Sequence, residues 1–230
     1  HAGAYAIIDP ESGATLESDR LPLGQGAGDD LEGLASRDGL LHAITSAGWI
    51  RTWKREAGAF VLVAGPYALG PVDLPDDPNN NKPPAGDGMV CDGRVTNCGR
   101  NYEGLALAPP GKAGACVGFA CSKADGHLYC LTEDAATKRL VVHRDQRIAV
   151  DRGGVVADCA FSPDGRLLVG NNLFGVSQVF EVENWHDLAA ANVTRVEQLG
   201  VGFPEAIAVR NDVIYRFSDT GGSPSLMAKF

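Results

Sequence analysis

Short apolar segments alternate with polar turns along most of the chain, and four of the segments begin in the same way. Each starts with a carboxylate at a polar border, continues with a small residue and then becomes apolar. The four are 30–35 around Glu32, 101–106 around Glu103, 157–161 around Asp158, and 204–208 around Glu205. This pattern is typical of an inner strand entered from a polar rim, and its recurrence predicts a repeat architecture.

A second apolar segment follows each of these and ends in two polar residues. The four segments are 41–46, 128–133, 167–172 and 214–219. The step from the carboxylate to the second polar residue is fourteen residues in three repeats, whereas the repeat of Glu103 is sixteen residues longer. We therefore interpret 111–123 as an inserted hairpin that a disulfide closes.

A third apolar segment completes the pattern, in 49–53, 140–143, 178–182 and 226–230. Three or four short strands per repeat predict an all-β fold, a small β-propeller of about four blades, with five blades as the alternative. The segment 16–23 precedes Glu32 much as 193–199 precedes Glu205. We expect this N-terminal strand to close the ring, because closure removes an exposed sheet edge.

The composition fits one domain over 1–230, with 29 glycines and 13 prolines that indicate many turns. The segment 71–99 lacks apolar periodicity and is expected to be a long inter-blade loop. A net charge of −9 without a basic stripe argues against nucleic acid as a partner, and no apolar run is long enough for membrane insertion. We expect a monomer whose partner is a small molecule or a protein.

Six cysteines fall into three sequential pairs, Cys91 with Cys98, Cys116 with Cys121, and Cys130 with Cys159. The first two pairs are close in sequence and lie among glycines and polar residues, where a disulfide would fix a loop. The alternative, a zinc site, requires short CxxC-type paired spacings that this sequence lacks. Disulfides predict a secreted or periplasmic protein.

Several short motifs of the sequence resemble those of a known group of propellers. They are 102–107 (YEGLAL), 128–133 (LYCLTE), 161–169 (FSPDGRLLV) and 217–219 (FSD). They resemble the phytase-like family, often labelled esterase-like, and are similar to SdiA-regulated and SMP-30/gluconolactonase-type propellers. The resemblance implies an axial calcium or other divalent ion at Glu103, Glu205, Asn172 and Asp219.

In a propeller, equivalent positions of the inner strands meet around the axis, so the four repeated carboxylates are expected to form one cluster. Such a cluster would raise at least one pKa unless a cation neutralised it. Oxygen-only ligands select calcium, or less often magnesium. The predicted metal ligands are Glu32, Glu103, Asp158, Glu205, Asn172 and Asp219. The alternative is that the carboxylates accept hydrogen bonds from backbone amides of adjacent blades and lock the ring.

The sequence therefore predicts a secreted calcium-binding propeller that binds a ligand or partner at its axial acidic face. One alternative is a metal-dependent hydrolase of phosphoesters, esters or lactones, for which Glu133 and Asp219 are the candidate bases. A metal-free structural or interaction propeller is the other.

Overall fold

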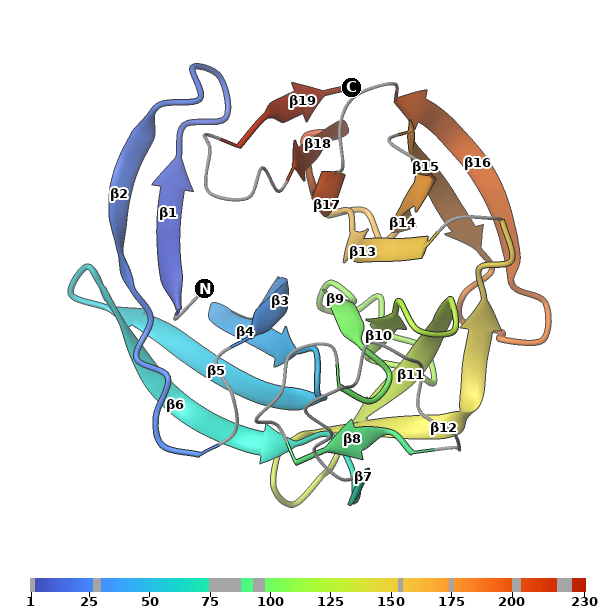
Figure 1. Ribbon diagram of the computed structural model, residues 1–230, viewed down its shortest axis with the longest axis horizontal. Helices are drawn as coiled ribbons and strands as arrows, with labels where there is room; N and C mark the ends of the chain where they lie inside the picture. Colours follow the sequence, from blue (N-terminus) through green and yellow to red (C-terminus); the bar gives the residue numbers. More distant parts are fainter. Residues whose placement is uncertain are drawn as a thin grey trace.

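The chain folds into a ring of four small antiparallel sheets with no helix in the described part (Figure 1). The structure is a computed structural model and describes residues 3–26, 30–74, 88–92, 98–152, 155–173, 176–199, 204–218 and 225–230. The predicted all-β, four-bladed propeller is confirmed. Within these ranges no helix has the length and hydropathy needed to cross a bilayer.

Each blade is a meander whose first strand lies nearest the axis (Figure 1). Blade 1 contains β3 (Leu31–Arg37), β4 (Leu40–Thr45), β5 (Trp49–Glu56) and β6 (Ala59–Ala68). Blade 2 contains β9 (Tyr102–Leu107), β10 (Gly118–Ser122), β11 (His127–Glu133) and β12 (Leu140–Ala149). Blade 3 contains β13 (Val155–Phe161), β14 (Leu167–Leu173), β15 (Val176–Glu183) and β16 (Asn192–Leu199). Blade 4 contains β17 (Pro204–Arg210), β18 (Val213–Ser218) and β19 (Met227–Lys229).

An N-terminal hairpin of β1 (Ala4–Ile8) and β2 (Thr15–Arg20) lies between blade 4 and blade 1 (Figure 1). The N-terminal strands thus fill the gap in the ring, as predicted, with β2 paired to β1 in the described residues. Lys229 Nζ donates to the Glu11 carbonyl at 3.3 Å on one side. On the other side, Trp53 Nε1 and Arg51 Nε each donate at 2.8 Å to the carbonyls of Pro22 and Leu23.

The second strand of blade 2 corrects the prediction that 111–123 is an inserted hairpin. Strand β10 pairs with β9 on one side and with β11 on the other, so it is a regular member of the blade. The segment Leu128–Glu133 is consequently the third strand of its blade, not the second. The loop that lengthens this repeat is 108–117, which joins β9 to β10.

The disulfides confirm that all six cysteines are paired, but two of the pairings differ from the expected ones. Cys91 pairs with Cys98 as predicted, whereas Cys116 pairs with Cys130 and Cys121 with Cys159. Five residues of extended chain span roughly 16 Å, which is too far for a disulfide between Cys116 and Cys121. Three disulfides are typical of extracellular or periplasmic proteins.

The inner strands share a β-bulge close to their first residue. The residue skipped in the pairing register is Glu32 in β3, Glu103 in β9, Ala157 in β13 and Glu205 in β17. Asp158 therefore occupies the place of Gly33, Gly104 and Ala206, one residue beyond the glutamates. The predicted alignment of Asp158 with the three glutamates is wrong by one residue, because the bulge shifts the register without changing the sequence pattern.

Neighbouring inner strands approach each other closely at two of these positions. A Cβ atom on Gly33 would lie 2.4 Å from the Leu105 nitrogen, and one on Gly104 would lie 2.6 Å from the Cys159 nitrogen. Only glycine allows backbones to come this near. In blades 1 and 2, the glutamate thus lies beside the axis, and the glycine that follows it contacts the inner strand of the next blade.

Apolar residues between the blades form the core. One buried cluster lies between blades 2 and 3 and includes Phe119, Leu128, Val169 and Trp185. Within the long segment between blades 1 and 2, β7 (Val72–Leu74) and β8 (Val90–Cys91) pair in parallel. The rest of the predicted loop, 75–87 and 93–97, lies outside the described residues.

Candidate functional site

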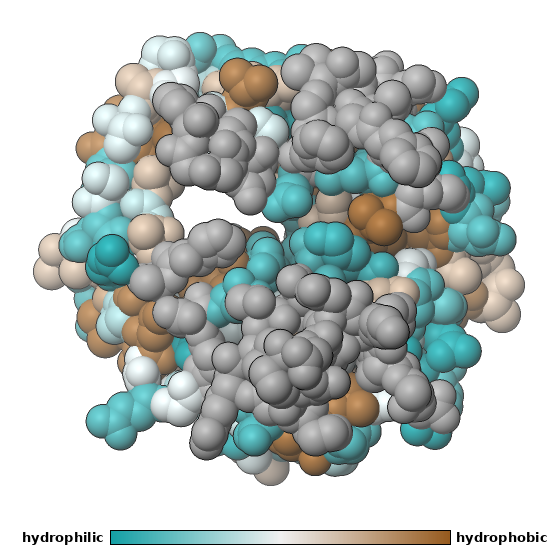
Figure 2. All heavy atoms as spheres, in the orientation of Figure 1, coloured by the Kyte–Doolittle hydropathy of each residue, from teal (hydrophilic) through white to brown (hydrophobic). Residues whose placement is uncertain are grey.

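Three glutamates from three blades meet near one end of the axis. The pKa of Glu32 is affected by the charges of Glu103, Asp30 and Glu205, and the pKa of Glu103 by Glu205 and Asp30. We call Asp30, Glu32, Glu103 and Glu205 the axial acidic cluster. Figure 2 shows hydrophilic residues beside the axis and an opening between the N-terminal hairpin and the inner strands. The charges of Glu32, Glu103 and Glu205 therefore act on one another, while the role of these residues as metal ligands stays a prediction.

Burial and negative charge act together on Glu32. Burial, the nearby charges of Glu103 and Asp30, and a hydrogen bond with Asp30 raise the pKa of Glu32 to about 9. Ser46 Oγ donates to Asp30 Oδ2 at 2.9 Å. At neutral pH, Glu32 is thus protonated and shares its proton with an aspartate.

Lys123 is the charged residue beside the axial acidic cluster that the sequence patterns did not identify. Its Nζ lies 3.0 Å from Glu103 Oε1, and Glu103 is only 4% exposed. Burial acts to lower the pKa of Lys123, but the charges of Glu103, Glu205 and Glu32 raise it overall. Burial raises the pKa of Glu103, although Lys123 opposes this. The cluster therefore already contains one cation that belongs to the chain.

A sequence signal for Lys123 existed. Tyr102 pairs with Ser122 across the β9–β10 hairpin, just as Leu31 pairs with Thr45 and Pro204 with Ser218. Lys123 therefore takes the place in blade 2 that Ser46 takes in blade 1, directly after the last paired residue of the second strand. Assigning Leu128–Glu133 as the second strand put Glu133 in this place instead.

Asp158 differs from the glutamates, because backbone amides occupy both of its carboxylate oxygens. Oδ2 accepts from the Ile207 nitrogen of the next blade at 2.8 Å, and Oδ1 from the Cys159 nitrogen at 2.7 Å. Burial raises the pKa of Asp158 to about 8, although the two amides and Arg216 lower it. This arrangement matches the alternative interpretation in which a carboxylate locks adjacent blades.

The remaining predicted site residues are placed as follows. Asn172 lies on β14 at the same end of the ring, and its Oδ1 is buried without a hydrogen-bond partner in the described structure. Asp219 lies outside the described residues. Glu133 lies at the last residue of β11, at the opposite end of its blade, and pairs with Lys138 at 3.3 Å. Glu133 is therefore not part of the axial acidic cluster.

The fit to calcium can be judged from the donors that are present. Carboxylates and the amide oxygen of Asn172 are the hard ligands that calcium prefers, and that oxygen lacks a donor. Glu205 makes no hydrogen bond with another described residue. No set of three or more acidic, His or Cys side chains in the described ranges is assembled as a metal-binding group. The chemical type of these donors suits calcium, but Lys123 forms an ion pair with Glu103, one of the expected ligands.

The raised pKa of Glu32 predicts how stability depends on pH. The pKa of Glu32 is about 9 in the folded protein, compared with 4.5 for an ordinary glutamate. Glu32 therefore favours folding at low pH, and this contribution to stability is lost as pH rises through 9. We expect the free energy of unfolding of Glu32→Gln, minus that of the parent protein, to rise by at least about 1 kcal/mol from pH 5 to pH 9. Urea unfolding in the presence of a chelator measures both values.

The control for this measurement is Glu133→Gln, which removes an exposed carboxylate outside the cluster. A difference between Glu32→Gln and the parent that stays constant over this pH range would show that Glu32 is not protonated in the folded protein.

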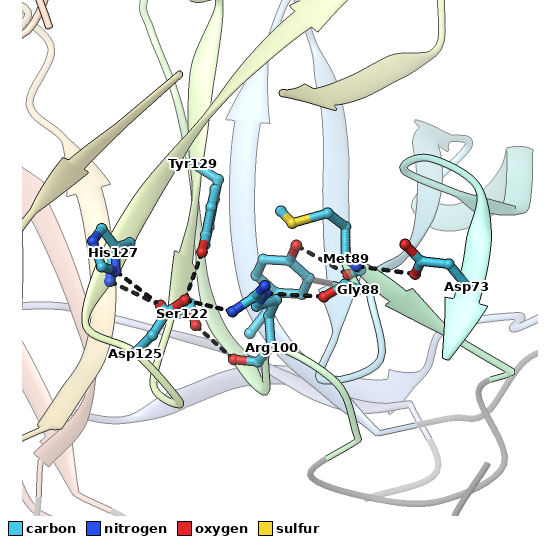
Figure 3. Close-up of polar contacts among 9 residues, drawn as sticks. Asp73, Gly88, Met89, Arg100, Ser122, Asp125, His127 and Tyr129 are labelled. Carbon is cyan, nitrogen blue, oxygen red and sulfur yellow. Dashed lines mark hydrogen bonds and ion pairs between the residues drawn. The ribbon is translucent and has the colours of Figure 1, made fainter. Parts of the chain in front are cut away.

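A second polar network lies beside Lys123, at the turn between β10 and β11 (Figure 3). Asp125 Oδ2 accepts from Arg100 Nη1 at 2.8 Å and from the Tyr129 hydroxyl at 2.5 Å. Asp125 Oδ1 lies 3.3 Å from His127 Nδ1. Burial acts to raise the pKa of Asp125. The hydrogen bonds of Tyr129 and Ser122 and the charges of His127 and Arg100 outweigh burial and lower this pKa overall.

This network anchors the described part of the long segment to blade 2. Arg100 Nε donates to the Gly88 carbonyl at 2.9 Å, and the Tyr102 hydroxyl donates to the Met89 carbonyl at 3.1 Å (Figure 3). Asp73 Oδ1 accepts from the Met89 nitrogen at 3.0 Å. Because Asp125 is engaged on both oxygens, it acts as a structural centre that fixes the turn next to Lys123.

The fold and the cluster define a four-bladed β-propeller with an acidic axial face. No protein-family model matches the chain, and no curated protein matches it in sequence. Among solved structures, it is similar to regucalcin, a calcium-binding protein from Agrobacterium tumefaciens, with 13% identity, a TM-score of 0.45, and coverage of 97% of this chain and 77% of that chain.

Two other solved structures are similar at the same level. One is a protein from Lactobacillus plantarum, with 16% identity, a TM-score of 0.45, and coverage of 98% of this chain and 77% of that one. The other is a luciferin-regenerating enzyme, with 11% identity, a TM-score of 0.41, and coverage of 96% and 65%. These similarities concern the propeller fold alone.

Proposed function

We propose that the chain is a binding propeller that works outside the cytoplasm and takes a divalent cation, calcium in the first instance, at its axial acidic cluster. The observation that supports the proposal is the mutual influence of the charges of Glu32, Glu103 and Glu205, which come from three separate blades. Three disulfides support an extracytoplasmic location. Regucalcin, whose fold is similar, is described as calcium-binding.

The residues that would hold the ion are Glu32, Glu103 and Glu205, with the Asn172 amide oxygen as a neutral donor. A bound divalent ion would supply fixed positive charge to which an anionic group of a ligand can bind. Glu32 would have to lose the proton that it shares with Asp30, and Glu103 would have to exchange its contact with Lys123. A ligand or partner would bind over this face.

The test is the melting temperature in calcium and in a chelator. If calcium is present at about a hundred times its dissociation constant, the stabilisation is about 2.7 kcal/mol, which corresponds to a rise of about 5 °C or more for a chain of this size. We expect Glu205→Gln to abolish most of this rise. The matched control, Glu133→Gln, should keep it.

Lys123→Met distinguishes the proposal from a metal-free propeller. Without Lys123 the cluster carries more negative charge, so we expect a larger rise in calcium than in the parent protein, together with lower stability in the chelator. An equal melting temperature with and without calcium in both proteins would contradict the proposal. Lys123 would then be the sole cation that neutralises the cluster.

A further inference from the structure

A pocket of about 430 Å³ lies at the opposite end of the axis from the axial acidic cluster. It is lined by the later residues of all four inner strands, among them Leu34 of β3, Leu105 of β9, Phe161 of β13 and Val209 of β17. The glutamates lie at the first residues of the same strands, so the two sites are at different ends of the ring. We call this cavity the distal pocket.

The lining of the distal pocket is mainly apolar, and part of it remains exposed. Leu34 is 54% exposed although it lies on an inner strand. Pro109 and Pro110 form a rigid part of the wall. Pockets that bind small molecules have this character, with volumes of roughly 300 to 1,000 Å³, an apolar lining and few polar groups.

Arg37 is the positively charged residue of the distal pocket wall. Its side chain is 18% exposed, and its Nε lies 3.4 Å from Asp38 Oδ2 without forming a hydrogen bond. The Asp38 side chain is 60% exposed, so water solvates much of its charge. Among the described residues, Asp38 is the one ion-pair partner of Arg37, and the buried Nε of Arg37 has no hydrogen-bond partner there. A carboxylate is the partner whose shape a guanidinium fits best.

The surroundings of Arg37 do not add a second positive charge. Burial and the charge of Arg37 lower the pKa of His42 to about 4, so this histidine is neutral under physiological conditions. His42 Nδ1 lies 3.1 Å from Thr52 Oγ1 within blade 1. Arg37 is therefore the one cation among the described residues that line this mainly apolar cavity, and Asp38 is the one anion.

We propose that the distal pocket binds a small molecule with an apolar body and one carboxylate, held by the apolar lining and by Arg37. The body contacts residues such as Leu34 and Val209, while the terminal nitrogens of Arg37 donate to the carboxylate. This site is independent of cation binding at the axial acidic cluster. It gives the ring a separate ligand at each end of its axis.

The test uses anilinonaphthalene sulfonate, whose fluorescence rises in apolar pockets, and measures its displacement by decanoate and by decan-1-ol. Both competitors are expected to displace the probe from the parent protein, with decanoate binding more tightly. Arg37→Gln should weaken decanoate by about tenfold or more, because a charge-assisted hydrogen bond is lost, and leave decan-1-ol nearly unchanged. Equal weakening of both competitors would overturn the role of Arg37.

Filling the cavity provides the second arm. Ala208 lines the distal pocket and is solvent-exposed, so Ala208→Trp should fold normally and reduce probe binding by about tenfold or more, because pocket volume is lost. The matched control is Ala135→Trp, at an exposed turn outside the pocket. A probe that binds Ala208→Trp as it binds the parent would overturn the proposal, and an unchanged circular dichroism spectrum confirms that each variant is folded.

Discussion

Asp158→Ala is expected to lower the free energy of unfolding by about 1–3 kcal/mol for each of two buried amides, those of Ile207 and Cys159, that lose their acceptor. Asp158 lies directly across the β13–β14 pair from Gly170. A Cβ atom on Gly170 would lie 1.8 Å from Arg216 Nη1, so this guanidinium of blade 4 packs onto the backbone of blade 3. Arg216 is 2% exposed, and burial lowers its pKa to about 10.

The Ile207 amide belongs to blade 4, so the loss of its acceptor weakens the contact between blades 3 and 4. Urea unfolding measures the loss, with Asp145→Ala as the control, since the Asp145 side chain is 94% exposed. A loss below about 1 kcal/mol for Asp158→Ala would show that Asp158 does not join the two blades.

Removal of the disulfide between blades 2 and 3 is the second change with a large expected effect. Cys121 on β10 and Cys159 on β13 are separated by 38 residues, and a closed loop of this length corresponds to about 4 kcal/mol. Replacement of both residues by alanine should therefore lower the free energy of unfolding by about that amount. Guanidinium unfolding measures it.

The control is the disulfide between Cys116 and Cys130, which stays within blade 2 and spans 14 residues. Its removal should cost less, about 3 kcal/mol, because the loop is shorter. Non-reducing peptide mapping by mass spectrometry tests the connectivity itself. A peptide that joins Cys116 to Cys121 would contradict the structure of blade 2.

Both changes affect the part of the ring that holds the axial acidic cluster in place. Gly33 and Gly104 bring the inner strands of blades 1, 2 and 3 together, Cys121 joins blade 2 to blade 3, and Asp158 joins blade 3 to blade 4. Each of these contacts lies within a few residues of a cluster glutamate. The cluster is thus built on rigid strands rather than on loops, which suits a preformed binding face.

The sequence predicts much of this fold because each blade repeats one local pattern. In blades 1, 3 and 4 the inner strand and the second strand follow each other through a short turn, such as the Asp164-Gly165 turn before β14. Blade 2 has a similar word, Asp125-Gly126, but there the turn joins the second strand to the third. The same turn chemistry serves either hairpin, so the sequence alone does not reveal which one it forms.

The sequence predicts those site residues that repeat as carboxylates in each blade. It does not predict residues whose position depends on strand register or on which strands pair. Glu32, Glu103 and Glu205 converge because equivalent bulges place them beside the axis. Asp158 has the same residue type but lies one position further along its strand, which turns a candidate ligand into an acceptor for backbone amides. The sequence analysis did not identify Lys123, because it interpreted the preceding strand, β10, as part of an inserted hairpin.

A high-resolution crystal structure grown with calcium tests most directly whether three blades bring their glutamates to one cation site. We expect Glu32, Glu103 and Glu205 around a single density peak with calcium–oxygen distances of about 2.3–2.6 Å, and Lys123 displaced from Glu103. Carboxylates that point away from one another, or a Lys123–Glu103 pair that persists without any ion in saturating calcium, would contradict it.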